Sequence, residues 1–194
     1  VEKVDSNIIY GDDRSVTQDP DEMFQSVIQS VKKVMEKSGI SPNQVAAIAL
    51  DGQMAGIMGV DDRGEAATPY DSWLDFRSAD YAEMMKKEAE QLVIRQSGMG
   101  PSINHGPKIL WWKHERPEIY RKIKKFTVPS SWITQKLAGL SGEETYLDYT
   151  NLHFTCFGDL RNLRWDKEIL QIFDVEEDKF PRIVDPCLQI GKLQ

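Results

Sequence analysis

The stretch VAAIALDGQMAGIMGV, residues 45–60, decides the fold predicted for this chain. Its first part, residues 45–50, is the longest unbroken apolar run and is predicted to form a buried strand. Residues 54–60 are predicted to form a second strand, which the Asp-Asp-Arg-Gly tight turn at 61–64 closes. A strand that follows a helix and leads directly into another strand predicts a mixed sheet with helices packed on it.

The polar turn inside this stretch is a candidate ligand site. Residues 51–56 place a flexible, amide-bearing segment between two apolar strands. Such a turn exposes backbone groups at the end of a sheet, where α/β proteins bind ligands. A plain connection between two strands is the alternative interpretation of the same residues.

The predicted helices follow from capping residues and apolar spacing. Asp19 and Pro20 begin the first helix, Glu22 completes a capping box, and Gly39 ends the helix. The apolar stripe of this helix is predicted to be core. Further helices are expected at residues 78–96, from Pro107, from Pro117, from Ser131 to Leu137, and after Asp166.

A second candidate site surrounds Trp73. Asp71, Asp75 and Arg77 lie within four residues of this Trp along the chain. An indole offers an apolar face to sugar C–H groups, while carboxylates and a guanidinium bind hydroxyls in directional pairs. The alternative is that Trp73 is core and that Asp75 and Arg77 cap the next helix.

Composition excludes several classes of protein. The 194 residues carry a net charge of −7, which argues against nucleic acid as a main partner. The longest apolar run is far shorter than the roughly 20 residues that span a bilayer, so no membrane partner is expected. Two cysteines, Cys156 and Cys187, are too few for a disulfide framework and favour a cytoplasmic location. The three histidines lack metal-ligand spacing, so no metal site is predicted.

Several motifs together resemble a known family, the FGGY carbohydrate kinases, which include xylulokinase and glycerol kinase. Residues 52–56 are similar to the family's Gly-Gln-Met-His-Gly turn, and residues 73–78 to its Trp-x-Asp-x-Arg-Thr segment. Residues 107–111 resemble its Pro-Lys-Leu-Leu-Trp signature, and residues 148–151 its Asp-Tyr-Thr-Asn run. Each match is weak alone, but their order along nearly the whole chain is specific. Trp112 departs from the family pattern, in which an aliphatic residue usually follows the signature Trp.

The resemblance implies an α/β fold of the ribonuclease H-like (actin-like ATPase) class, with a mixed sheet flanked by helices. It implies that residues 1–194 are the sugar-binding, amino-terminal domain of a kinase, without the first phosphate-binding hairpin and the ATP domain. ATP and Mg²⁺ are expected as cofactors, bound mainly outside this chain. No catalytic base is assigned within residues 1–194, because the resemblance places the family's base in a Gly-Asp motif beyond these residues.

The resemblance also implies which residues contact substrate: Gln53, Met54, Ala55, Trp73, Asp75, Arg77, Asn104 and His105. The implied reaction is ATP-dependent phosphorylation of a sugar or polyol hydroxyl by the full-length enzyme. A ketopentose such as xylulose is the preferred substrate, although Ala55 replaces a side chain that touches substrate in relatives. A homodimer is one candidate assembly. The alternative function is a non-catalytic sugar-sensing or interaction module on the same fold.

Overall fold

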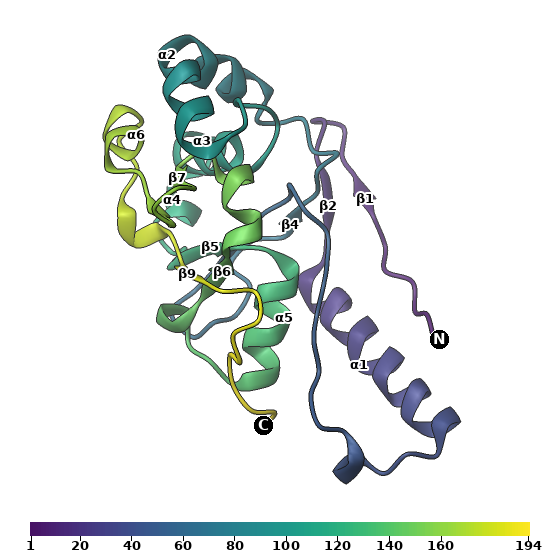
Figure 1. Cartoon of the computed structure of the whole chain (residues 1–194). Helices are drawn as coiled ribbons and strands as arrows, with labels where there is room; N and C mark the ends of the chain where they lie inside the picture. Colours follow the sequence, from purple (N-terminus) through teal and green to yellow (C-terminus); the bar gives the residue numbers. More distant parts are fainter.

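The strands of this protein form four small sheets that pack among six α-helices. The computed structural model describes residues 1–194. The helices are α1 (Pro20–Ser38), α2 (Ala79–Ser97), α3 (His105–Glu115), α4 (Pro117–Tyr120), α5 (Pro129–Ala138) and α6 (Lys167–Ile172). Figure 1 shows α1 and the N-terminal segment on one flank of the molecule, with α2 and α3 at the end away from the C-terminus.

Antiparallel and parallel pairing both occur, so the arrangement is mixed. The strands are β1 (Ile9–Tyr10), β2 (Val16–Gln18), β3 (Met58–Val60), β4 (Tyr70–Asp71), β5 (Lys125–Thr127), β6 (Tyr146–Asp148), β7 (Gly158–Asp159), β8 (Arg164–Trp165) and β9 (Arg182–Val184). The first sheet has the order β1-β2-β4, and the others are the pairs β3-β5, β6-β9 and β7-β8. All of these pairs are antiparallel except β6-β9, which is parallel.

One residue pair links the first two sheets. Ile57 and Asp71 form an isolated antiparallel bridge, in which each backbone N–H donates to the carbonyl of the other residue. The bridge aligns the strands in the order β1-β2-β4-β3-β5. It also attaches the segment that precedes β3 to the strand that leads into the Trp73 loop.

The start and end of α1 are as predicted, but its capping box is not formed. The Asp19 side chain accepts hydrogen bonds from the backbone N–H groups of Asp21 and Glu22, and Gly39 ends the helix in the left-handed conformation. Glu22 does not return a bond to the cap. Its carboxylate instead accepts from the backbone and side chain of Asn7, at 3.1 and 2.8 Å. The competing contact is tertiary, so the local pattern could not show it.

The prediction that the apolar stripe of α1 is core is wrong for most of the helix. Pro20 is the buried residue of α1, and Val31 and Val34 are 39% and 44% exposed. The first turns do pack, since Phe24 lies edge-on to Trp132 of α5. Val27 also packs against the small cluster of buried residues, whereas the later part of the stripe is largely exposed.

The buried strand predicted at residues 45–50 is also absent. This segment has no strand partner, and Val45 and Ile48 are 41% and 40% exposed. A strand needs a neighbour that accepts and donates its backbone hydrogen bonds, and residues 45–50 pair with no other strand of this chain. The following strand is shorter than predicted, because residues 54–56 form a turn before β3 begins.

Two helices begin earlier than predicted. Helix α3 begins at His105 after Asn104, so Pro107 lies in its first turn and does not open it. Helix α5 begins at Pro129, and Ser131, the predicted cap, lies inside the first turn. Proline tolerates the first turn because its missing N–H would have no partner there. The predicted Gly139 terminus and the Asp166 cap of α6 are confirmed.

The core consists of a large and a small hydrophobic cluster. The large cluster joins α2, α3, β5, α6 and the segments after β6. The small cluster, built from Met58, Val60, Tyr70, Trp132 and Ile133, lies between β3, β4 and α5. No helix has the length and apolar content that crossing a membrane requires.

Gly56 is predicted to be intolerant of any side chain. A Cβ at this position would lie 2.1 Å from Tyr70 Oη and 2.5 Å from the Asp71 carbonyl oxygen, which is backbone. We expect Gly56→Ala to lower the free energy of unfolding by about 2 kcal/mol, because the Ile57–Asp71 bridge must separate.

Gly100→Ala is the matched control, since its nearest atom would lie 3.6 Å away. Chemical denaturation of both variants measures the difference. Equal stabilities of the two variants would contradict the close approach at Gly56.

Candidate functional site

The turn before β3 holds three of the residues predicted to contact a ligand. Gln53 donates through Nε2 to Gln18 Oε1 of β2 at 2.8 Å. Met54 is 59% exposed, and Ala55 is half-buried with a φ of 62°. A left-handed Ala is strained by about 1–2 kcal/mol. The turn therefore presents its backbone and Met54 at the surface in an unfavourable conformation.

The backbone of β4 holds this turn next to the Trp73 loop. Ile57 N–H donates to the Asp71 carbonyl at 3.1 Å, and Asp71 N–H donates to the Ile57 carbonyl at 2.8 Å. Gly56 allows the approach, because any Cβ there would meet Tyr70 and Asp71. Two candidate segments far apart in sequence are thus adjacent in the fold.

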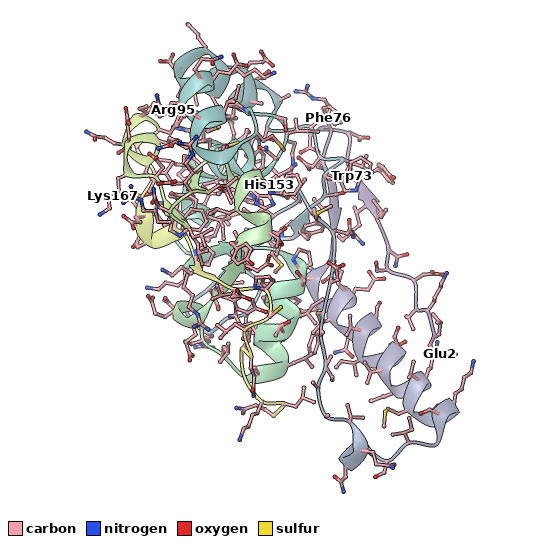
Figure 2. The ribbon with its side chains drawn as sticks, in the orientation of Figure 1. Glu2, Trp73, Phe76, Arg95, His153 and Lys167 are labelled. Carbon is pink, nitrogen blue, oxygen red and sulfur yellow. The ribbon has the colours of Figure 1, made fainter.

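The Trp73 loop, residues 72–78, is fixed by its backbone and leaves two aromatic rings exposed. Ser72 N–H donates to the Val16 carbonyl at 3.0 Å, and Phe76 N–H donates to the Arg14 carbonyl at 3.2 Å. The Trp73 and Phe76 side chains are 54% and 50% exposed. Figure 2 shows both near the outer edge of the molecule, beside β1 and β2. Trp73 therefore offers an indole face to solvent, contrary to the interpretation that places it in the core.

Asp75 lies beneath this loop and has no free oxygen. It is 1% exposed, its Oδ2 accepts from Val16 N–H at 2.9 Å, and both oxygens accept from Arg77 Nε at 2.9 and 3.2 Å. Lys108 of α3 donates through Nζ to the Asp75 carbonyl at 2.8 Å. These contacts join β2, the loop and α3.

Asp71 completes a buried cluster of charges. Its Oδ1 accepts from Arg77 Nη2 and its Oδ2 from Trp112 Nε1, both at 2.6 Å. The Arg77 guanidinium lies over the ring of Trp111, 4.2 Å from its centre. We call Asp71, Asp75, Arg77 and Lys108 the ion cluster; its two negative and two positive groups balance. Removing one member of such a cluster leaves a buried charge uncompensated and typically costs about 3–5 kcal/mol.

Burial is the largest cause of the pKa shifts of Asp71 and Lys108 in the ion cluster. It raises the pKa of Asp71 to about 6, with a further increase from Asp75, against the opposing effects of Arg77, Lys108 and the Trp112 hydrogen bond. Burial also lowers the pKa of Lys108, while the two carboxylates oppose that change. Each group is thus shifted toward its neutral form by lost hydration and back toward its charged form by its partners.

Asn104 and His105 lie at the start of α3 and are both buried. Asn104 Oδ1 accepts from the Cys156 thiol at 3.2 Å, whereas Asn104 Nδ2 and His105 Nε2 have no hydrogen-bond partner. Burial, with smaller effects of Lys108 and His153, lowers the pKa of His105 to about 3. The imidazole is therefore neutral at physiological pH.

The structure divides the predicted contact residues into surface and interior groups. Gln53, Met54 and Trp73 are exposed, Ala55 is half-buried, the Arg77 side chain is 11% exposed, and Asp75, Asn104 and His105 are buried. Sequence reasoning missed the roles of Asp71 and Trp112. The departure from the family pattern at Trp112 was the available signal, since an indole N–H inside a protein needs an acceptor.

The structure provides no site of its own for the expected Mg²⁺. No group of three or more His, Cys, Asp or Glu side chains is arranged to hold a metal ion. The two carboxylates beside the Trp73 loop, Asp71 and Asp75, are paired with Arg77 and Lys108.

Comparisons with known proteins agree on one family. The model described as the FGGY family of carbohydrate kinases, N-terminal domain, matches residues 1–194. The gluconokinase of Bacillus licheniformis is 30% identical over 169 residues, covering 86% of this chain and 32% of the relative. The glycerol kinase of Thermococcus onnurineus is 27% identical over 173 residues, covering 87% and 34%. The chain thus spans about a third of the length of the curated relatives it matches.

Solved structures support the fold. Gluconate kinase from Lactobacillus acidophilus has a TM-score of 0.86 at 24% identity, covering 98% of this chain and 38% of that one. Plasmodium falciparum glycerol kinase with ADP has a TM-score of 0.87 at 20% identity, covering 98% and 39%. The expected actin-like ATPase fold class is confirmed.

Replacing Ala55 with glycine tests the strained turn. We expect Ala55→Gly to raise the free energy of unfolding by up to about 1 kcal/mol, because glycine adopts a positive φ without steric cost. Ala82→Gly, inside α2, is the control and should lower it by about 1 kcal/mol. Urea denaturation distinguishes the two. A loss of stability in Ala55→Gly would mean that the Ala55 methyl group makes contacts that outweigh the strain.

The buried His105 predicts a dependence of stability on pH. Its pKa falls from 6.5 to about 3 on folding, so between these values the unfolded chain binds one proton that the folded chain does not. The His105 contribution is complete above pH 6.5 and is lost as the pH falls toward 3, with a slope of up to about 1.4 kcal/mol per pH unit. The pKa of Asp71 rises on folding from 3.8 to about 6, so its contribution to stability has the opposite dependence and is lost as the pH rises through this range.

Comparing variants isolates the histidine from the other groups. His105→Gln should flatten the fall in stability at acid pH relative to the wild type. His114→Gln, at an exposed position of α3, controls for the loss of one imidazole. If His105→Gln and the wild type lose stability in parallel from pH 7 to pH 4, the buried neutral state of His105 is refuted.

Proposed function

The chain belongs to the FGGY family of carbohydrate kinases, and we propose that it is the sugar-binding part of an enzyme that transfers a phosphoryl group from ATP to a sugar or polyol hydroxyl. In this proposal residues 1–194 form one amino-terminal domain. The printed names of its relatives include glycerol kinase, gluconokinase, autoinducer-2 kinase and xylulose kinase. Their shared reaction class supports the kinase assignment.

The exposed Trp73 indole is the observation that carries the proposal. It is half-exposed while the base of its loop is held by the buried ion cluster. A sugar presents C–H groups on the faces of its ring and hydroxyls at its edge. An indole held in place can cover such a face with little loss of conformational entropy on binding.

The polar contacts to the sugar are assigned mainly to the turn at residues 53–56. Gln53 and the backbone groups of Met54 and Ala55 lie at the surface next to the Trp73 loop and can donate to and accept from hydroxyls. Arg77 and Asp75 act by holding the loop, because their polar atoms bind each other and Asp71. Asn104 and His105 are buried at the start of α3, so their proposed contact with substrate, through the polar nitrogen atoms that have no partner, requires that the segment before α3 move on binding.

Catalysis is assigned to the full-length enzyme. Proton removal from the attacking hydroxyl requires a base within hydrogen-bond reach of it. Asp71 and Asp75 are buried beneath the loop and bound to cations, so neither is assigned that role. ATP and Mg²⁺ remain the proposed cofactors, and this chain alone is proposed to be inactive.

A ketopentose such as xylulose is the substrate we propose within the family. The Gln53-Met54 pair in the turn supports it through its likeness to the motif of ketopentose kinases. The proposed setting is the cytoplasm, with neither nucleic acid nor membrane as a partner and a homodimer as one candidate assembly. The net charge of −7 is consistent with small-molecule substrates and not with nucleic acid.

A sugar-sensing module without catalysis is the second candidate function. The same exposed indole and turn would bind a sugar whether or not phosphoryl transfer follows. Sugar-dependent stabilisation of the full-length protein, without consumption of ATP, would favour this candidate over the kinase.

Removing the Trp73 indole tests the site. In the full-length protein, Trp73→Ala should raise the KM for the sugar by about tenfold or more, the loss expected for one buried aromatic contact, and leave the KM for ATP nearly unchanged. Steady-state kinetics with each substrate varied in turn measure both constants.

Tyr10→Ala is the control for that variant, because Tyr10 is an exposed aromatic residue on β1 outside the Trp73 loop. It should change neither KM. Equal increases in the two constants for Trp73→Ala would count against stacking on the sugar. A phosphorylation screen of the full-length protein with Mg-ATP against D-xylulose, D-gluconate, glycerol and other ketoses and polyols tests the substrate.

A further inference from the structure

Asp71 is bonded to three separate elements of the fold at once. Its backbone N–H and carbonyl form the bridge to Ile57, directly after the turn at residues 53–56. Its carboxylate accepts from Arg77 on the Trp73 loop and from Trp112 on α3, each at 2.6 Å. Asp71 and Trp112 are 1% and 4% exposed, so neither side chain reaches a ligand itself.

We infer that Asp71 and Trp112 act together as positioning residues that set the placement of the Trp73 indole relative to the turn at residues 53–56. This inference rests on the proposed function, since it assigns to the pair the geometry of the sugar-binding surface. Apart from this pair, the two segments are linked through the Ile57–Asp71 bridge and through hydrogen bonds that each makes to β2.

Trp112 makes the carboxylate directional. An isolated Asp71–Arg77 pair could rotate about the Asp71 side chain, but a second short bond to the other oxygen fixes the plane of the carboxylate. The fixed plane determines where Arg77 Nη2 lies. Arg77 in turn binds Asp75 through Nε and lies over the ring of Trp111. The position of the Trp73 loop therefore depends on the orientation of the Asp71 carboxylate.

The charge balance of the ion cluster strengthens this coupling. Asp71 is one of two anions that face Arg77 and Lys108 inside the protein. Loss of the Asp71 charge would leave one cation in excess. Because a buried cation without a counter-charge is unfavourable, Arg77 would then move outward to become hydrated. The Arg77 side chain is 11% exposed, so its edge already reaches the surface, and an outward movement would carry the Trp73 loop with it.

The inference is tested with Asp71→Asn, Trp112→Phe and the double variant. Trp112→Phe retains an aromatic ring and removes only the N–H donor. The control is Trp132→Phe, which removes another buried indole N–H, bonded to the Gly64 carbonyl at 3.1 Å at the far end of β3. Backbone contacts of the turn are untouched in all four variants.

The first readout needs no enzymatic activity. With ¹⁵N-labelled tryptophan, the Trp73 indole resonance should sharpen and exchange faster with water in Asp71→Asn and in Trp112→Phe, because the loop becomes more mobile. Trp132→Phe should leave the Trp73 resonance as in the wild type. The double variant should resemble the more affected single variant, since both changes break one linkage.

The second readout is the KM for the sugar of the full-length protein, measured with D-xylulose, D-gluconate and glycerol. Asp71→Asn and Trp112→Phe should each raise it by about tenfold, the loss of roughly one charge-assisted hydrogen bond, with the KM for ATP unchanged. If Asp71→Asn does not fold, the Trp73 resonance and the sugar KM of Trp112→Phe alone test the inference.

The outcomes separate the two proposals. If both variants lose stability as Trp132→Phe does but retain the wild-type Trp73 resonance and sugar KM, the pair is merely structural and the inference is overturned. If the Trp73 resonance responds as expected but the wild type phosphorylates none of the sugars, the positioning inference stands and the proposed substrates fail.

Discussion

The buried ion cluster is the constraint on which the candidate site depends. Two carboxylates and two cations lie in the interior and are tolerated because each charge has an opposite partner and directional hydrogen bonds. Such an arrangement permits few alternative geometries, since any displacement leaves a charge without compensation. It therefore fixes β2, the Trp73 loop and α3 relative to one another more strictly than apolar packing would.

The candidate site combines the buried ion cluster with exposed side chains. Trp73 and Met54 face solvent, while the residues that support them are buried and saturated with hydrogen bonds. The turn between Met54 and Gly56 stores strain at Ala55, which the close packing of Gly56 against Tyr70 and Asp71 maintains. Rigid support of exposed contact groups lowers the entropy lost on binding a small polar ligand.

Sequence patterns were reliable where the structure is local. The Asp19 and Asp166 caps, the Gly39 and Gly139 termini and the turn at residues 61–64 each depend on a few neighbouring residues, and all are present. The predictions that residues 45–50 form a buried strand and that the stripe of α1 is core were wrong, because burial requires a packing partner from another part of the chain. An apolar run shows only that a segment can be buried, and here Val45 and Ile48 remain 41% and 40% exposed.

The sequence by itself determined the family, the mixed α/β class and the segments that form the candidate site, because these follow from motif order and local capping chemistry. It also selected Trp73, whose exposure the structure then displayed. Only the tertiary structure decided which of the candidate residues are exposed and which are buried in ion pairs. Asp75 and Arg77 are sugar-contact candidates in the sequence; in the fold the Asp75 carboxylate accepts from Val16 N–H and Arg77, and Arg77 also binds Asp71. Charge pairing across elements depends on distances that no linear pattern encodes.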